Sequence, residues 1–332
     1  MPALDRVRGP AAPHRYRQAL QAGPHREVLV NTDSPVELAG GVLVAIGTPS
    51  EEATFTLTED ATQDRRAVTV ASVSDALAEL RRRCLRWPQA AAVCDDVLRA
   101  LDVDAPARSG VIAESLAYST LQAGPEFARW LAERGPAQLP DIANPVVAQR
   151  DGDTLRISFN RPQRHNAFST DARAELLEFL GVAQLDTSVD EVVLTGNGPS
   201  FCSGGDLGEF GTFDDPASAH LARTRHSPAL VLDELTDRLG RACRAEVHGQ
   251  VLGSGLEMAA FCGHVTCAPG ATLGLPELAL GLIPGAGGTV SITRRIGRWR
   301  TAYLVLSGAS IDAETALAWG LVDEVGAGRP GE

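Results

Sequence analysis

The sequence predicts an α/β fold that is preceded by a smaller α+β segment. After residue 144, strand patterns alternate with helical patterns, which is typical of a sheet covered by helices. Before residue 140, short strand patterns come first and helical patterns follow. Glycine-dense loops follow strand patterns of the second segment, and such loops let the backbone approach a ligand closely.

The first segment divides into a tail and an accessory domain. Residues 1–25 contain four prolines and little periodicity, so we expect a loose tail. Residues 26–140 are predicted to form a small α+β domain. Its strand patterns lie at 27–30, 41–46, 53–57 and 67–71, and its helical patterns begin after Ser72 and continue at 89–101, 110–122 and 125–134.

The second segment, residues 144–332, is the predicted catalytic core. Its strand patterns lie at 155–159, 191–195, 244–247 and 264–268, and its helical patterns at about 170–183, 216–239 and 254–263. The three glycine-dense loops span 196–205, 249–255 and 281–288.

Composition excludes several classes of protein. The net charge of −12 argues against a nucleic-acid binder, because phosphate binding needs clustered cations. All 30 cations are arginine, so neither a Schiff-base lysine nor a P-loop lysine is present. We expect no membrane span, since no apolar run approaches 18 residues, and no signal peptide. Six cysteines are too sparse for a disulfide framework, which predicts a cytoplasmic location.

Two glutamates are the main candidates for proton transfer. Glu257 lies in the first turn of the helix that follows the second glycine loop, and Glu277 lies in an apolar loop. Burying a carboxyl group raises its pKa toward the range that suits proton transfer. Unpaired N–H groups of the nearby loops can stabilise an oxyanion. The pattern predicts proton chemistry next to a carbonyl, although a surface acid at Glu257 and a steric role for the glycines are the alternatives.

Other kinds of chemistry have weaker support. Neither Ser203 nor Ser254 lies in a Gly-x-Ser-x-Gly motif, so neither is a predicted nucleophile. The segment 262–267 combines two cysteines and a histidine but has no partner pair, and we predict no metal site. No Gly-x-Gly-x-x-Gly motif opens a helix after the first strand, which disfavours a dinucleotide fold.

Four segments, in order and near family spacing, resemble the crotonase superfamily, the enoyl-CoA hydratase/isomerase family. They are residues 160–168, 201–207, 248–257 and 273–289. The resemblance covers roughly residues 144–325 and implies a spiral of ββα units that binds a coenzyme A thioester. It places Glu257 and Glu277 where hydratases keep two catalytic glutamates, and so implies an enoyl-CoA hydratase that adds water across the α–β double bond.

The same resemblance assigns further residues. It places the backbone N–H groups of Ser203 and Ser254 on the thioester oxygen, and Ser254 departs from the glycine common in hydratases. It implies no resident cofactor, since coenzyme A is part of the substrate. The implied residues for binding coenzyme A and substrate are Arg161, Arg164, His165, Gly204, Gly205, Asp206, Leu207 and Gly253.

Two departures from the family pattern keep alternatives open. The chain has little sequence beyond the segment 320–323 and carries about 140 residues in front of the core. An extension in front of the core also occurs in the family's cofactor-independent arylacetyl-CoA dioxygenase, so that reaction, an isomerase and a non-catalytic interaction protein are the alternatives. The resemblance implies a homo-oligomer, a trimer or hexamer. We expect residues 110–140 to pack beside the acyl pocket or at a subunit interface.

Overall fold

The computed structural model describes residues 35–137, 143–212 and 215–326, and these belong to one compact unit, Pro35–Glu332. The predicted tail over 1–25 and the predicted strand at 27–30 lie outside the described residues. Within the described ranges, no helix is both long enough and apolar enough to cross a membrane.

The first segment folds as a small sheet followed by four helices. The sheet has the order β1-β2-β3-β4, in which β1 is antiparallel to β2 and the remaining pairs are parallel. Ser72 caps the first helix by accepting the Asp75 N–H at 3.2 Å, as predicted. The elements are β1 (Val36–Glu37), β2 (Leu43–Ile46), β3 (Phe55–Thr58), β4 (Ala67–Thr69), α2 (Val73–Arg86), α3 (Pro88–Ala100), α4 (Ala107–Gln122) and α5 (Pro125–Arg134).

The second segment contains a six-stranded sheet with the order β13-β10-β8-β7-β6-β5. The hairpin of β5 and β6 is antiparallel, and every other pair is parallel. A second, three-stranded sheet has the order β12-β11-β9. The strands are β5 (Val146–Asp151), β6 (Thr154–Phe159), β7 (Glu191–Gly196), β8 (Cys243–Val247), β9 (Gln250–Leu252), β10 (His264–Cys267), β11 (Thr272–Gly274), β12 (Ser310–Asp312) and β13 (Glu324–Val325).

The helical pattern predicted over 216–239 is two helices, α7 (Pro216–Arg225) and α8 (Pro228–Leu239). Pro228 cannot continue the preceding helix, and Ser227 caps the next one. The other helical elements are η1 (Pro162–Arg164), α6 (Thr170–Leu185), η2 (Gly240–Ala242), α9 (Ser254–Ala259), η3 (Glu277–Leu280), α10 (Gly288–Ser307) and α11 (Ala313–Trp319).

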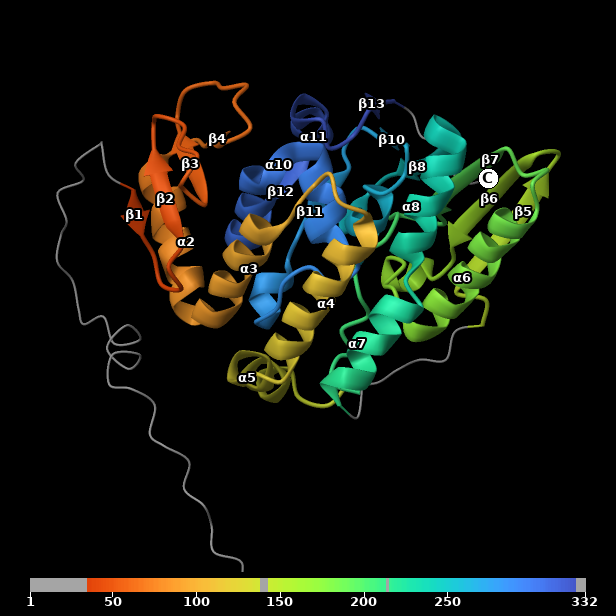
Figure 1. Cartoon of the computed structure of the whole chain (residues 1–332), viewed down its shortest axis with the longest axis horizontal. Helices are drawn as coiled ribbons and strands as arrows, with labels where there is room; N and C mark the ends of the chain where they lie inside the picture. The colour runs from red at the N-terminus through yellow and green to blue at the C-terminus, as the bar shows by residue number, and fades with distance from the viewer. Residues whose placement is uncertain (1–34, 138–142, 213–214, 327–332) are drawn as a thin grey trace, which may run out of the picture. The chain divides into compact units, whose positions relative to one another are not determined.

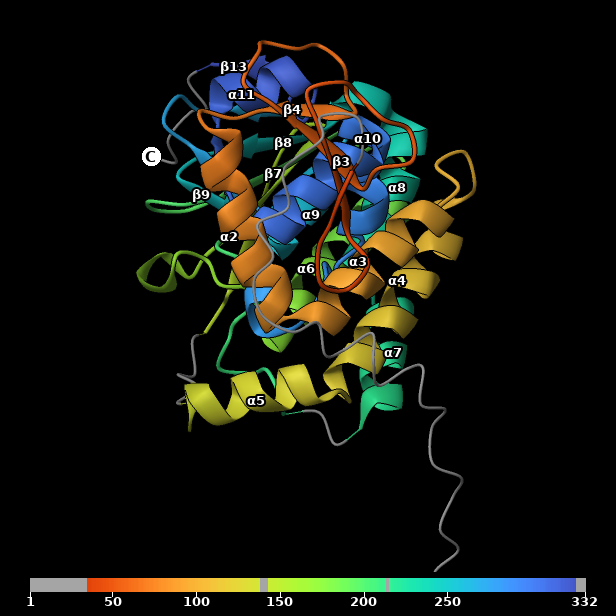
Figure 2. The same ribbon diagram turned by 90° about the vertical axis from the view of Figure 1, so that its left-hand side faces the viewer.

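The helices of the first segment pack directly on the second. Helix α4 runs beside α7 (Figure 1), and α3 and α4 lie against α10 (Figure 2). The approach of α4 to α10 is close, since a Cβ atom on Gly110 would lie 2.5 Å from Val290 Cγ2. Their apolar side chains belong to one continuous core. The expected packing of this region on the core is therefore confirmed for α4, and the division into an accessory domain and a catalytic core stays a prediction.

Candidate active site

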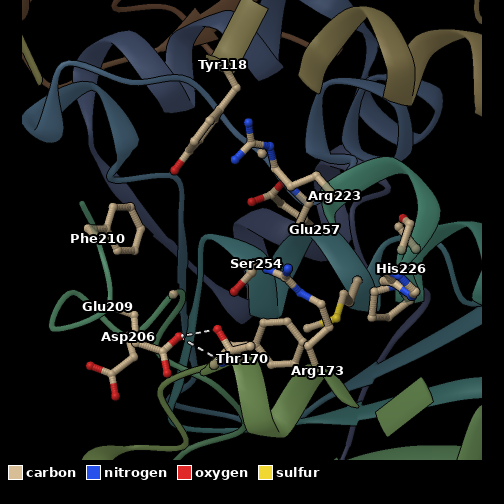
Figure 3. A pocket seen from close by; sticks show the side chains of 18 of the residues that line it. Tyr118, Thr170, Arg173, Asp206, Glu209, Phe210, Arg223, His226, Ser254 and Glu257 are labelled. Carbon is tan, nitrogen blue, oxygen red and sulfur yellow. Dashed lines mark hydrogen bonds between the residues drawn. The ribbon is translucent and has the colours of Figure 1, made fainter. Parts of the chain in front are cut away.

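A pocket lies between α4, the N-terminus of α6, the loop after β7, helices α7 to α9 and the loop before α10 (Figure 3). It encloses about 940 Å³, part of which is open to solvent. Both candidate glutamates line it, together with apolar side chains and a set of polar ones. The polar lining residues include Tyr118, Gln122, Thr170, Arg173, Asp206, Glu209, Arg223, His226 and Ser254.

Glu257 is buried, with 2% of its surface exposed. Its Oε2 atom accepts hydrogen bonds from the N–H groups of Ala286 at 2.7 Å and Gly288 at 2.8 Å. These two bonds to one oxygen atom hold the side chain in place. Burial raises the pKa of Glu257 to about 7, although the two N–H groups oppose this rise. The carboxyl group can therefore exchange a proton near neutral pH.

Glu277 begins the short helix η3 and is also buried. Its Oε2 atom has no hydrogen-bond partner within the described residues. Burial, and next the carboxyl group of Glu257, raise the pKa of Glu277 well above its ordinary value. Gly253 makes room for this side chain, because a Cβ atom there would lie 2.6 Å from Glu277 Oε1. The structure thus brings both predicted acids to one pocket.

The backbone donors differ from those predicted. The Ser203 N–H donates to the His165 carbonyl oxygen at 2.9 Å, so its hydrogen is already engaged. This corrects the prediction that Ser203 faces an oxyanion. Gly205 is bridged to Phe168 through the Gly204 carbonyl and the Asp206 N–H, which directs its own N–H to the opposite side.

The N–H groups of Gly205 and Ser254 have no acceptor among the described residues, and both residues line the pocket. Ser254 is the first residue of α9, where an N–H lacks a partner within the helix and the helix dipole favours negative charge. Both N–H groups are therefore candidates to donate to an oxygen atom of a ligand in this pocket.

The Arg161 side chain is buried and bonded to other residues of the protein. It is 3% exposed, and its guanidinium donates to the Ala167 carbonyl oxygen and, at 2.9 Å, to Asp206. Burial alone would raise the pKa of Asp206, but the Gly208 N–H and the guanidinium groups of Arg161 and Arg164 hold it below its ordinary value. The predicted contact of Arg161 with coenzyme A is therefore wrong, because the group is enclosed with its own carboxylate.

The remaining predicted contacts occupy varied places. Arg164 donates to Asp206 at 2.8 Å and keeps 35% of its side chain exposed. The His165 ring pairs with the Ser200 hydroxyl at 2.8 Å. Leu207 is 47% exposed, whereas the buried Asp206 belongs to the arginine cluster. Gly204 carries a φ of 94°, a conformation that favours glycine. The roles of Arg164, His165, Gly204 and Leu207 toward coenzyme A stay predictions.

Four residues at the pocket or at the loop before α10 were not predicted from the sequence. Tyr118 of α4 lines the pocket, and Arg223 of α7 stacks over its ring at 4.4 Å (Figure 3). Arg173 lines the pocket without an ion pair to any described carboxylate. Glu114 of α4 is buried behind the pocket wall. Each lies in an ordinary helical pattern without a motif, so no local signal identified it.

No group of three or more metal-ligating side chains is arranged around a common point in the ranges the structure describes. All six cysteines are buried free thiols.

Comparisons with known proteins relate the chain to one enzyme family. The sequence model of the enoyl-CoA hydratase/isomerase family matches residues 150–329. The 2,3-dehydroadipyl-CoA hydratase of Escherichia coli (strain K12) is 36% identical over 180 residues, which cover 54% of this chain and 68% of that protein. The mevalonyl-coenzyme A hydratase sidH of Aspergillus fumigatus is 31% identical over 195 residues, which cover 56% of this chain and 67% of that protein.

Among solved structures, the enoyl-CoA hydratase from Thermoplasma volcanium GSS1 is 32% identical, with a TM-score of 0.48. The similarity covers 55% of this chain and 72% of that one. Since the family's sequence model matches more than half of the residues, the chain belongs to the enoyl-CoA hydratase/isomerase family of enzymes, within the crotonase superfamily.

Proposed function

We propose that this chain hydrates the α–β double bond of an enoyl-CoA thioester. The observation that supports this most is the meeting of two buried carboxyl groups, Glu257 and Glu277, with two unpaired N–H groups in one pocket. Family membership supports a thioester as the substrate. No resident cofactor is needed, since coenzyme A enters as part of the substrate.

The N–H groups of Gly205 and Ser254 would hold the thioester oxygen. They would polarise the carbonyl and stabilise the enolate-like state that forms when water attacks the β carbon. Loss of one such donor typically costs about 10²–10³ in rate. Gly205 takes the place that the sequence analysis gave to Ser203, because the Ser203 N–H is bonded to His165.

The two glutamates would divide the proton transfers. Glu257 accepts two backbone N–H groups, which favour its charged form, whereas Glu277 Oε2 accepts none within the described residues. Burial beside the Glu257 carboxyl group raises the pKa of Glu277, so Glu277 would hold a proton and deliver it to the α carbon. Glu257 would take the proton from the attacking water. The water oxygen then forms the new bond at the β carbon, and the thioester stays intact.

The pocket favours an acyl group with an anionic or hydrogen-bond-accepting end. Arg173 and Arg223 both line it, and burial lowers the pKa of each guanidinium without removing its charge. Arg223 is bonded to neutral acceptors, the hydroxyls of Ser115 and Ser119 and the amide of Gln122. Arg173 has no hydrogen-bond acceptor among the described residues, so its guanidinium could donate to a carboxylate on the substrate. The name of the Escherichia coli relative, a dehydroadipyl-CoA hydratase, is in keeping with this.

A panel of enoyl-CoA thioesters tests the proposal. Crotonyl-CoA, a longer alkyl homologue, an aromatic enoyl-CoA and one ending in a carboxylate are compared by loss of the conjugated enoyl absorbance. We expect turnover, with the carboxylate-ended substrate giving the highest kcat/KM. No turnover with any of them would contradict the hydratase. Oxygen consumption with an arylacetyl-CoA would then favour the dioxygenase alternative, and isomerised product the isomerase.

The homo-oligomer that the family resemblance implies is also a proposal for this chain. Light scattering coupled to size-exclusion chromatography measures the mass directly. A trimer or hexamer is the expected result, and a monomer would contradict it.

A further inference from the structure

Glu114 is a buried carboxyl group that the proposed chemistry does not use. It lies on α4, in the segment outside the family match, and is 1% exposed. Its Oε1 atom accepts the Gly287 N–H at 2.7 Å. Its Oε2 atom accepts the Thr289 N–H at 2.8 Å and the Thr289 hydroxyl at 2.7 Å. A buried carboxylate with three donors is held firmly.

The donors of Glu114 alternate with those of Glu257 along one loop. The N–H groups of Ala286 and Gly288 bind Glu257, and those of Gly287 and Thr289 bind Glu114. Four consecutive N–H groups at the start of α10 are therefore shared between two carboxyl groups. Any change that releases Gly287 and Thr289 from Glu114 also alters the donors that orient Glu257.

Helix α4 touches this loop a second time, one turn further along. A Cβ atom on Gly285 would lie 2.5 Å from the ring of Tyr118, so the ring packs directly on the loop backbone. Glu114 and Tyr118 project from the same face of α4 because they are four residues apart. The helix thus holds both the conformation of the loop and one wall of the pocket.

The surroundings of Glu114 are unfavourable for a second negative charge. Burial, and next Glu257, raise the pKa of Glu114, and Glu114 in turn contributes to the raised pKa of Glu277. The charged or titratable groups within the described residues that interact electrostatically with Glu114 are Glu257 of α9, Glu277 of η3 and Arg223 of α7.

We propose that Glu114 is a positioning residue for Glu257 and Glu277, supplied by a helix outside the segment that matches the family. It fixes the loop Gly285–Thr289, and through the loop it fixes the orientation of Glu257. Its carboxyl group also belongs to the electrostatic environment of Glu277. The inference rests on the proposed function for its catalytic part, whereas its effect on the loop is independent of any substrate.

The test compares Glu114→Gln with Glu126→Gln in the full chain. Glu126 is a matched control, because it is also buried in this segment and accepts two N–H groups, those of Gln89 at 2.8 Å and Ala90 at 3.0 Å. Gln keeps the shape of Glu, but its NH₂ group cannot accept the loop hydrogens. Three measurements are made on each protein: kcat and KM over a pH series, and hydrogen exchange of the amides at 286–289.

We expect Glu114→Gln to lower kcat about 10- to 100-fold while KM changes less than about 2-fold, because the loop orients an acid used in the transition state. The midpoint of the pH–kcat profile that belongs to Glu277 should move to lower pH, since Glu114 contributes to the raised pKa of Glu277. Exchange at 286–289 should become faster. Glu126→Gln should leave all three unchanged. A folded Glu114→Gln protein with the original kcat, pH profile and exchange would overturn the proposal.

Two further results keep the inference separate from the proposed function. If the unaltered protein turns over no thioester, the proposed function fails, and unchanged exchange at 286–289 in Glu114→Gln would still overturn the role on the loop. If Glu114→Gln does not fold, Thr289→Val takes its place, because it removes one donor and keeps the shape. A 2- to 5-fold lower kcat at constant KM is then expected, and no change in kcat or exchange would contradict the proposal.

Discussion

The segment 35–137 and the segment 143–326 both bury glutamates, but the sequence around these glutamates differs between the two segments. Glu257 and Glu277 lie beside glycine-dense loops that form the pocket. Glu114 and Glu126 lie within helices α4 and α5, whose sequences have no glycine motif at these positions. Both sets are nonetheless almost equally buried.

This difference reflects how each segment builds its part of the site. In the second segment the backbone itself contributes N–H groups and must bend sharply, which requires glycines that are visible in the sequence. In the first segment only side chains reach the loop, from regular helices. A regular helix needs no special residue to present Glu114, so local sequence carries no sign of its role.

The largest effect we expect is the loss of a proton-transfer group. Glu257→Gln and Glu277→Gln should each lower kcat by about 10²–10⁴, because a positioned acid or base contributes that much. Binding of a non-reactive acyl-CoA should change little, as isothermal titration would measure. Full activity of either variant would contradict the comparison between the two segments, because the altered glutamate beside a glycine-dense loop would then not be a catalytic acid.

Much of the fold follows from sequence periodicity. The strands β6, β7, β8 and β10 and the helices α2 to α6 lie where the patterns predict them. The six-residue strand β5 was not predicted. The strands β9, β11 and β12 were not predicted either, because three-residue strands contain too few alternations to give a pattern. The break between α7 and α8 was not predicted, although Pro228 is a sequence signal for the end of a helix.

The next largest effect we expect is a difference in stability between variants of Arg161 and Arg164, two arginines of one motif. Arg161→Gln should lower the free energy of unfolding by about 3–5 kcal/mol, because it leaves the buried Asp206 with only one cation. Arg164→Gln should cost no more than about 1 kcal/mol, since 35% of its side chain is exposed. Urea denaturation measures both.

The result also bears on coenzyme A. KM for the thioester should rise for Arg164→Gln if that residue contacts a phosphate. Equal stability losses in the two variants would contradict the assignment of Arg161 as a buried structural residue. Sequence reasoning treated the two arginines alike, because neither the three-residue separation nor the residue type indicates which guanidinium is enclosed.

A smaller effect tests the contact between the two segments. Gly110→Ala should lower the free energy of unfolding by about 1 kcal/mol, because the new Cβ would lie 2.5 Å from the stiff Val290 side chain. Gly181→Ala is the matched control in α6, where no atom lies within 4 Å of the added Cβ. It should raise stability by about 0.5–1 kcal/mol through the better helix propensity of alanine. Equal effects would mean that α4 does not press on α10.

The smallest effect we expect is at Ser254, where the backbone N–H and not the side-chain hydroxyl is proposed to act. The Ser254 hydroxyl is buried without a hydrogen-bond partner within the described residues, so removing it costs no bond. Ser254→Ala keeps the N–H at the start of α9, and we expect kcat to change less than about 3-fold and the melting temperature to stay or rise. A fall of about 10²-fold in kcat would assign the catalytic contact to the hydroxyl. The second segment would then resemble the first in acting through a side chain, and the contrast between glycine-marked backbone donors and helix-borne side chains would not hold.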